Sequence, residues 1–179
     1  MATITKYQPR YLGNADGKPA ICRGGPESPD IKETASQSYL TGAPVYYDSN
    51  GTIAVNATGD PVTAGIAGFA TKKATGTTGT AARYRVLRPG DRYIMNCADS
   101  ETTALTNVGL IFPCDVASGI LLVDTSTALV PTADAGNTLY CRILGLYTAA
   151  NGYPEATDAV GDVNGRYIVE FPAQAAMQG

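Results

Sequence analysis

A hairpin signal in the first third of the chain constrains the fold more than any other feature. The run Leu40–Val55 (LTGAPVYYDSNGTIAV) places Asn50-Gly51 between two short apolar segments. Asn-Gly supplies the positive φ angles that a two-residue hairpin turn needs. A further apolar segment follows over residues 62–70. Short strands joined by tight turns are typical of antiparallel sheets, so we expect an all-β fold.

The rest of the body repeats this pattern of short strands between turn residues such as Arg88–Asp91 (RPGD) and Asn164-Gly165. Only residues 99–105 favour one or two helical turns. Short strands at this spacing predict a single antiparallel β-barrel or sandwich over residues 39–172, with a tail at 173–179. The expected strands are 45–48, 52–55, 62–71, 81–87, 92–97, 108–112, 120–123, 139–147 and 166–171.

Residues 1–38 differ from the body because Gly and Pro recur there at a density that opposes helices and long strands. The segment nevertheless carries large anchoring side chains, namely Tyr7, Tyr11, Leu12, Ile21 and Ile31. A disordered tail has little use for such side chains, whereas an arm that docks on a partner needs them. We therefore expect an extended N-terminal arm, poorly ordered in the free protein, that can add a strand to a neighbour's sheet edge.

Charge limits the classes of partner. Charged residues make up 16% of the chain, the net charge is −3 and the pI is about 4.8, whereas soluble domains usually carry about 25% charged residues. Nucleic-acid binding normally rests on a basic face, and the basic residues here are dispersed among acids, so no nucleic-acid partner is expected. No apolar run of membrane-spanning length and no secretory signal is visible, so we expect synthesis in a cytoplasm and no membrane partner.

The residue types give little support to catalysis. Histidine is absent, which removes the commonest general base and the Ser-His-Asp arrangement. Most acids sit at turns, where Asp bonds its own backbone. The four cysteines, Cys22, Cys97, Cys114 and Cys141, are far apart, so buried free thiols are favoured over a zinc site. We expect no enzyme activity, no metal and no cofactor.

Tyrosine is abundant, and Tyr46-Tyr47 points one ring to each face of its strand. One ring is expected in the core. The other is expected to face outward, where tyrosine favours protein interfaces. A sugar-binding platform is the alternative for the outer ring.

Four segments carry a familiar pattern in their order and spacing: Val45–Ile53 (VYYDSNGTI), Ala64–Ala70 (AGIAGFA), Val86–Asn96 (VLRPGDRYIMN) and Gly161–Phe171 (GDVNGRYIVEF). Together they resemble the small head-decoration (capsid cement) proteins of tailed bacteriophages. The resemblance implies a β-rich barrel or sandwich that binds the outside of an expanded capsid and has no catalytic residues.

On this resemblance we expect a structural virion protein on the capsid exterior, made in the host cytoplasm. Its partner would be the major capsid protein, which it would bind as a homo-oligomer, a trimer or dimer. The candidate contact residues are the five anchors of the arm with Tyr46 and Tyr47. The alternatives are a phage tail or head–tail connector subunit, a carbohydrate-binding adhesion module, and a hydrolase that uses carboxylates on a β scaffold.

Overall fold

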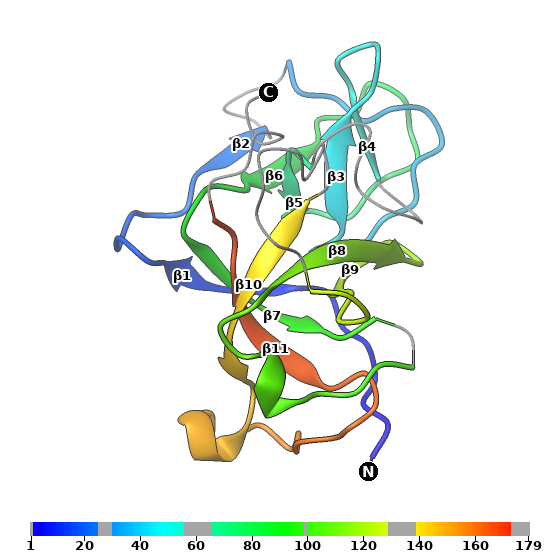
Figure 1. Cartoon of the computed structure of the whole chain (residues 1–179). Coiled ribbons are helices and arrows are strands. Elements are labelled where there is room, and N and C mark those ends of the chain that lie inside the picture. The colour runs from blue at the N-terminus through cyan, green and yellow to red at the C-terminus, as the bar shows by residue number, and fades with distance from the viewer. Residues whose placement is uncertain (1, 25–29, 56–65, 99, 129–138, 173–179) are drawn as a thin grey trace.

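The computed structural model describes residues 2–24, 30–55, 66–98, 100–128 and 139–172. Two antiparallel sheets make up this part of the chain, as the turn and strand pattern predicts. In Figure 1 the five-stranded sheet lies above the six-stranded sheet.

The larger sheet curls into a half-barrel. Its closure joins Cys97, just after β7, to Val123 at the end of β9 through a parallel bridge. The Ala98 N–H also donates to the Val123 carbonyl at 2.8 Å. In spatial order the strands are β1 (Arg10–Asn14), β7 (Asp91–Asn96), β11 (Arg166–Glu170), β10 (Tyr140–Leu146), β8 (Ile111–Ala117) and β9 (Ile120–Val123).

The smaller sheet depends on a close approach between β5 and β6. A Cβ atom on Gly68 would lie 1.8 Å from the Arg85 carbonyl oxygen, so a side chain there would push the two strands apart. Glycine is the residue that permits such contact between backbones. In spatial order the strands are β2 (Cys22–Gly24), β6 (Arg83–Val86), β5 (Gly68–Ala70), β3 (Pro44–Tyr47) and β4 (Ile53–Val55).

One large core joins the two sheets. Phe69 of β5 packs against Tyr93 of β7, with ring centroids 4.6 Å apart, and Tyr93 meets Phe171 edge-on at 5.7 Å. Leu87, which follows β6, belongs to the same buried cluster as the inward side chains of the half-barrel. Aromatic side chains bury large apolar areas, so this contact is the main hydrophobic link between the sheets.

Each expected strand has a counterpart, but two sets of bounds are wrong. The strand expected over 62–71 is observed as β5, Gly68–Ala70, and residues 62–65 lie outside the described residues, as does the expected tail at 173–179. The strand expected over 108–112 extends to Ala117. It begins later, at Ile111 of β8, because residues 105–107 form a 3₁₀ turn (η1) and Gly109 takes a φ of 88°. A second 3₁₀ turn, η2 (Ala149–Asn151), precedes the loop that leads to β11. Among the described residues, no helix is long and apolar enough to cross a membrane.

The hairpin between β3 and β4 has a three-residue loop over residues 49–51, between the strand ends that the sequence predicts, but it is not the two-residue Asn-Gly turn type. The Asp48 N–H donates to the Thr52 carbonyl at 2.9 Å, and the Asp48 carboxylate accepts from the backbone N–H groups of Asn50 and Thr52. Only Gly51 has a positive φ, of 75°. The carboxylate holds the loop, so one left-handed residue is enough.

The N-terminal segment forms an outer strand of each sheet. β1 pairs antiparallel with β7 at one edge of the larger sheet, and β2 pairs antiparallel with β6 at one edge of the smaller. Further along, the Ala82 N–H donates to the Ile31 carbonyl at 2.9 Å. Both edges are therefore covered by the chain's own N-terminal segment. Docking of this segment on a capsid or on a neighbouring copy stays a prediction.

Candidate functional site

The expected contact residues of the arm do not form one surface. Tyr7 and Ile21 are exposed, with 55% and 44% of their surface accessible. Tyr11 packs edge-on against Tyr93 at 5.2 Å and is half-buried. Leu12 packs on the outer face of the larger sheet, and Ile31 packs against the core of the smaller one. Of these five residues, only Tyr7 and Ile21 are therefore exposed enough to offer a large part of their side chain to a partner.

Neither tyrosine of the pair in β3 lies in the core, so the expectation of one buried ring is wrong. Tyr46 is half-buried, and Tyr47 is 40% exposed. Val45, on the same face as Tyr47, fills the core position instead and is fully buried. The Tyr47 hydroxyl lies at the edge of that core, 2.7 Å from the Tyr84 hydroxyl. The Tyr47 ring is thus partly exposed on the surface of the smaller sheet, where a partner could contact it.

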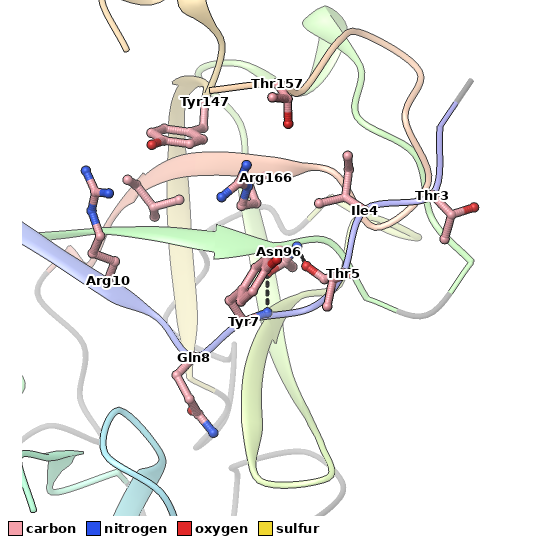
Figure 2. Close-up of a pocket in the computed structure, with 11 residues that line it drawn as sticks. Thr3, Ile4, Thr5, Tyr7, Gln8, Arg10, Asn96, Tyr147, Thr157 and Arg166 are labelled. Carbon is pink, nitrogen blue, oxygen red and sulfur yellow. Dashed lines mark hydrogen bonds between the residues drawn. The ribbon is translucent and has the colours of Figure 1, made fainter. Parts of the chain in front are cut away.

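A pocket of about 480 Å³ lies beside the first ten residues, and Figure 2 shows its lining. Asn96 of β7 fixes the chain along it, because its side-chain oxygen accepts from the Tyr7 N–H at 2.9 Å. The Asn96 amide group donates to the Asn164 carbonyl at 2.7 Å. The Ile4 N–H donates to the Val163 carbonyl at 2.8 Å. We call this cavity the N-terminal pocket.

An arginine ion pair forms the wall of the N-terminal pocket. Arg166, the first residue of β11, donates through its Nε, an Nη and its backbone N–H to the Asp158 carboxylate. Hydrogen bonding by Asp158 raises the pKa of the Arg166 guanidinium. The guanidinium also lies 4.6 Å from the ring of Tyr147 and 5.8 Å from that of Tyr7. These contacts keep the cation in place, paired and partly desolvated.

The second arginine of this pocket is also paired. Arg10 donates to Glu155 at 3.1 Å, and the Tyr147 hydroxyl donates to the same carboxylate oxygen at 2.7 Å. Because both arginines already hold carboxylates, the charged groups of the N-terminal pocket are satisfied within the chain. The hydrogen bonds around the pocket hold the N-terminal segment against β7 and the start of β11.

A pair of carboxyl groups, which the sequence did not predict, lies near the closure of the half-barrel. Glu101 and Asp124 are hydrogen-bonded neighbours, and burial raises the pKa of Glu101. Glu101 also accepts from the N–H and hydroxyl of Thr125, at 2.6 and 2.7 Å. Among the described residues, no cluster of three or more metal-ligating side chains occurs. The pair is bonded to the turn after β9, which is a structural use of both groups.

Three of the four cysteines are buried free thiols, as expected. Cys97, Cys114 and Cys141 point into the half-barrel, and burial raises the pKa of Cys97 to about 12. Cys22 in the edge strand β2 is exposed, so the expectation of burial is wrong there.

A fixed loop presents three large apolar side chains to solvent. Leu105, Val108 and Leu110 are 64%, 38% and 44% exposed. The Tyr167 hydroxyl accepts from the Ala104 N–H at 2.7 Å and anchors the start of the loop. The Ile143 N–H donates to the Leu110 carbonyl at 3.0 Å and anchors its end. We call residues 105–110 the apolar loop.

The sequence alone did not single out this loop, because Val108 and Leu110 were expected inside a strand. The signal that could have found it is the spacing of large apolar residues around Gly109, which interrupts the strand pattern. Exposed apolar residues that are gathered on one feature mark interaction sites more often than single ones do.

Neither a family model nor a curated protein sequence matches this chain.

Proposed function

We propose that this chain is a structural virion protein that binds the outer surface of a phage capsid and cements neighbouring capsid subunits. The observation that carries the binding role is the apolar loop, three exposed aliphatic side chains on a loop hydrogen-bonded at both ends. The resemblance of the four sequence segments to head-decoration proteins supports the capsid as the partner. A protein that binds only assembled subunits stabilises the shell by mass action.

The charged groups support a binding role rather than catalysis. In the part of the chain that the structure describes, the buried acids Glu33, Asp91, Asp158 and Asp162 all accept hydrogen bonds from nearby backbone or side-chain groups. Groups held in this way serve the fold and are poorly placed to exchange protons with a substrate. We propose that the protein acts without enzyme activity or cofactor, as a homo-oligomer on the capsid exterior.

The contact can be tested with a matched pair of leucines. Leu105 and Leu40 are almost equally exposed, at 64% and 66%, but only Leu105 belongs to the apolar loop. Full burial of a leucine contributes about 1.5–3 kcal/mol, so the exposed part of Leu105 is worth about 1–2 kcal/mol. Leu105→Ser should weaken binding to purified capsids by about 5–30-fold. Leu40→Ser should leave binding unchanged.

Cosedimentation with capsids of the virus that encodes the chain measures this difference, and cryo-electron microscopy of the particles locates the protein. Density on the outer capsid surface, with the apolar loop at the contact, is the expected result. Density in the tail or at the head–tail junction would replace the proposal with the tail or connector alternative. Equal loss of binding in both leucine variants would exclude the apolar loop as the contact.

A further inference from the structure

The N-terminal pocket is large enough for a small ligand and open to solvent. Its volume of about 480 Å³ lies within the range of small-molecule sites, about 300–1,000 Å³. Much of its lining consists of exposed residues, namely Thr3, Thr5, Tyr7, Arg10 and Thr157. A ligand can therefore reach these side chains without any rearrangement of the sheets.

Accessible polar groups of this lining still have hydrogen-bonding capacity. The hydroxyls of Thr3, Thr5 and Thr157 have no hydrogen-bond partner among the described residues. Arg166 gives its Nε and one Nη to the Asp158 carboxylate, and its second Nη donates to no described group. That second Nη is not among the buried atoms that lack a partner, and the Arg166 side chain is 20% exposed. Its N–H groups are therefore open to a ligand.

The charges of the two pocket arginines are cancelled within the chain. Arg166 pairs with Asp158, and Arg10 pairs with Glu155. A charged ligand would either displace one of these carboxylates or lie in the pocket without a counter-charge, and both are costly where water is partly excluded. A neutral ligand that donates and accepts hydrogen bonds meets neither cost.

Apolar surfaces lie between these polar groups. The Arg166 guanidinium is 5.8 Å from the ring centroid of Tyr7 and 4.6 Å from that of Tyr147, as Figure 2 shows. Beyond that contact Tyr7 keeps 55% of its surface accessible. Ile4 and Ile94 add aliphatic surface to the lining. An exposed aromatic ring beside spaced hydroxyl and guanidinium groups suits a ligand with one apolar face and a polar rim.

We propose that the N-terminal pocket binds a neutral sugar ring. The C–H face of the sugar packs on the exposed part of Tyr7, and its hydroxyls bond to the second Nη of Arg166 and to the threonine hydroxyls. The ring comes either from a free monosaccharide or from a residue of a glycan. This inference does not rest on the capsid role, and it assigns the sugar site to this pocket rather than to the tyrosine pair in β3.

The test is a titration of the ¹⁵N-labelled full chain, followed by amide chemical shifts. The probes are D-glucose, D-galactose, D-mannose and N-acetyl-D-glucosamine, each as the free sugar and as its methyl glycoside. Saturable shifts at Tyr7, Asn96 and Arg166 are expected with at least one of them. Tighter binding of the free sugar indicates a monosaccharide ligand, and binding of the methyl glycoside that is at least as tight indicates a glycan residue.

Variants connect the shifts to the pocket. Tyr7→Ala removes the exposed ring but keeps the backbone N–H that donates to Asn96, and it should weaken binding by about 2–10-fold. Thr157→Val keeps the shape and removes one hydroxyl, and it should weaken binding by about 2–10-fold. Tyr47→Ala is the control, since Tyr47 is a partly exposed tyrosine that does not line this pocket. Its affinity should be that of the wild type.

Two further ligands test the chemistry, namely sorbitol, an open chain with hydroxyls but no ring, and D-glucuronate, a sugar ring with a charge. The proposal is overturned if no sugar saturates, or if sorbitol or D-glucuronate binds as tightly as the best neutral sugar. It is also overturned if Tyr7→Ala binds that sugar like the wild type. Where Tyr7→Ala cannot be purified, an unchanged affinity in Thr157→Val overturns it. A loss in Tyr47→Ala equal to that in Tyr7→Ala places the binding elsewhere and also overturns it.

Discussion

Removing the charge of Asp158 tests how strongly a buried ion pair holds the N-terminal pocket together. The Asp158 side chain is 1% exposed and that of Arg166 is 20% exposed. The carboxylate accepts from the Arg166 backbone N–H at 2.8 Å, from its Nε at 3.0 Å and from an Nη. Asp158→Asn keeps the size of the side chain but leaves the guanidinium without a counter-charge.

Breaking a buried pair by removing one partner costs about 3–5 kcal/mol. Because Arg166 keeps some contact with water, we expect the lower end, about 3 kcal/mol, in the free energy of unfolding. For a chain of this size that corresponds to a fall in Tm of about 6–12 °C. Urea unfolding followed by circular dichroism, with the m-value compared between variants, measures the change.

Glu155→Gln is the matched control, because it makes the same acid-to-amide change opposite another arginine of the same pocket. Arg10 and Glu155 are 58% and 50% exposed, and exposed pairs contribute about 0–1 kcal/mol. In an Arg166→Met background, Asp158→Asn should cost almost nothing, since no cation is then stranded. The reasoning is refuted if Asp158→Asn costs no more than Glu155→Gln, or if its cost is the same with and without Arg166.

Two further predictions concern acid sensitivity and thiol exposure. Hydrogen bonds from Thr34, then from Thr52 and Asn50, lower the pKa of Asp48 from its usual 3.8 to about 2. Its contribution to stability is therefore fully present above pH 3.8 and is lost as the pH falls through 2. Asp48→Asn should lower Tm at pH 7 and much less at pH 2, and an equal shift at both pH values would contradict this. With a thiol reagent such as DTNB, one cysteine of the native protein, the exposed Cys22, should react rapidly, and all four should react after denaturation. Rapid reaction of two or more thiols in the native protein would show that the half-barrel opens.

The sequence predicted the strands of the body well, because their signals are local. Apolar runs bounded by Gly, Pro and Asn mark where a strand begins and ends, whichever neighbour it later pairs with. The hairpin at Asn50-Gly51 shows the limit of such signals. Its place was predicted correctly, but its turn type was not, because the Asp48 carboxylate holds the loop and its bonds depend on the folded geometry.

The N-terminal segment shows why local patterns did not give the pairing of strands. Its Gly and Pro residues indicated an extended arm, and the side chains of Tyr11 and Leu12 were interpreted as contacts for a partner. In the structure, the strands of this segment pair with sheet edges of the same chain: β1 pairs with β7, and β2 pairs with β6. A strand that needs a sheet edge carries no information about which chain supplies it.

The sequence by itself determined that this chain is a β-rich protein with little charge and no histidine. Charge and histidine content follow from composition alone, and the strands follow from turn residues whose effect extends over only a few positions. Only the tertiary structure decided which polar groups meet. Glu101 and Asp124, or Arg85 with Tyr93 and Gln8, are far apart along the chain and converge only where the sheets fold together. Burial and a counter-charge are properties of that convergence, and in the N-terminal pocket they turn ordinary residues into a satisfied ion pair.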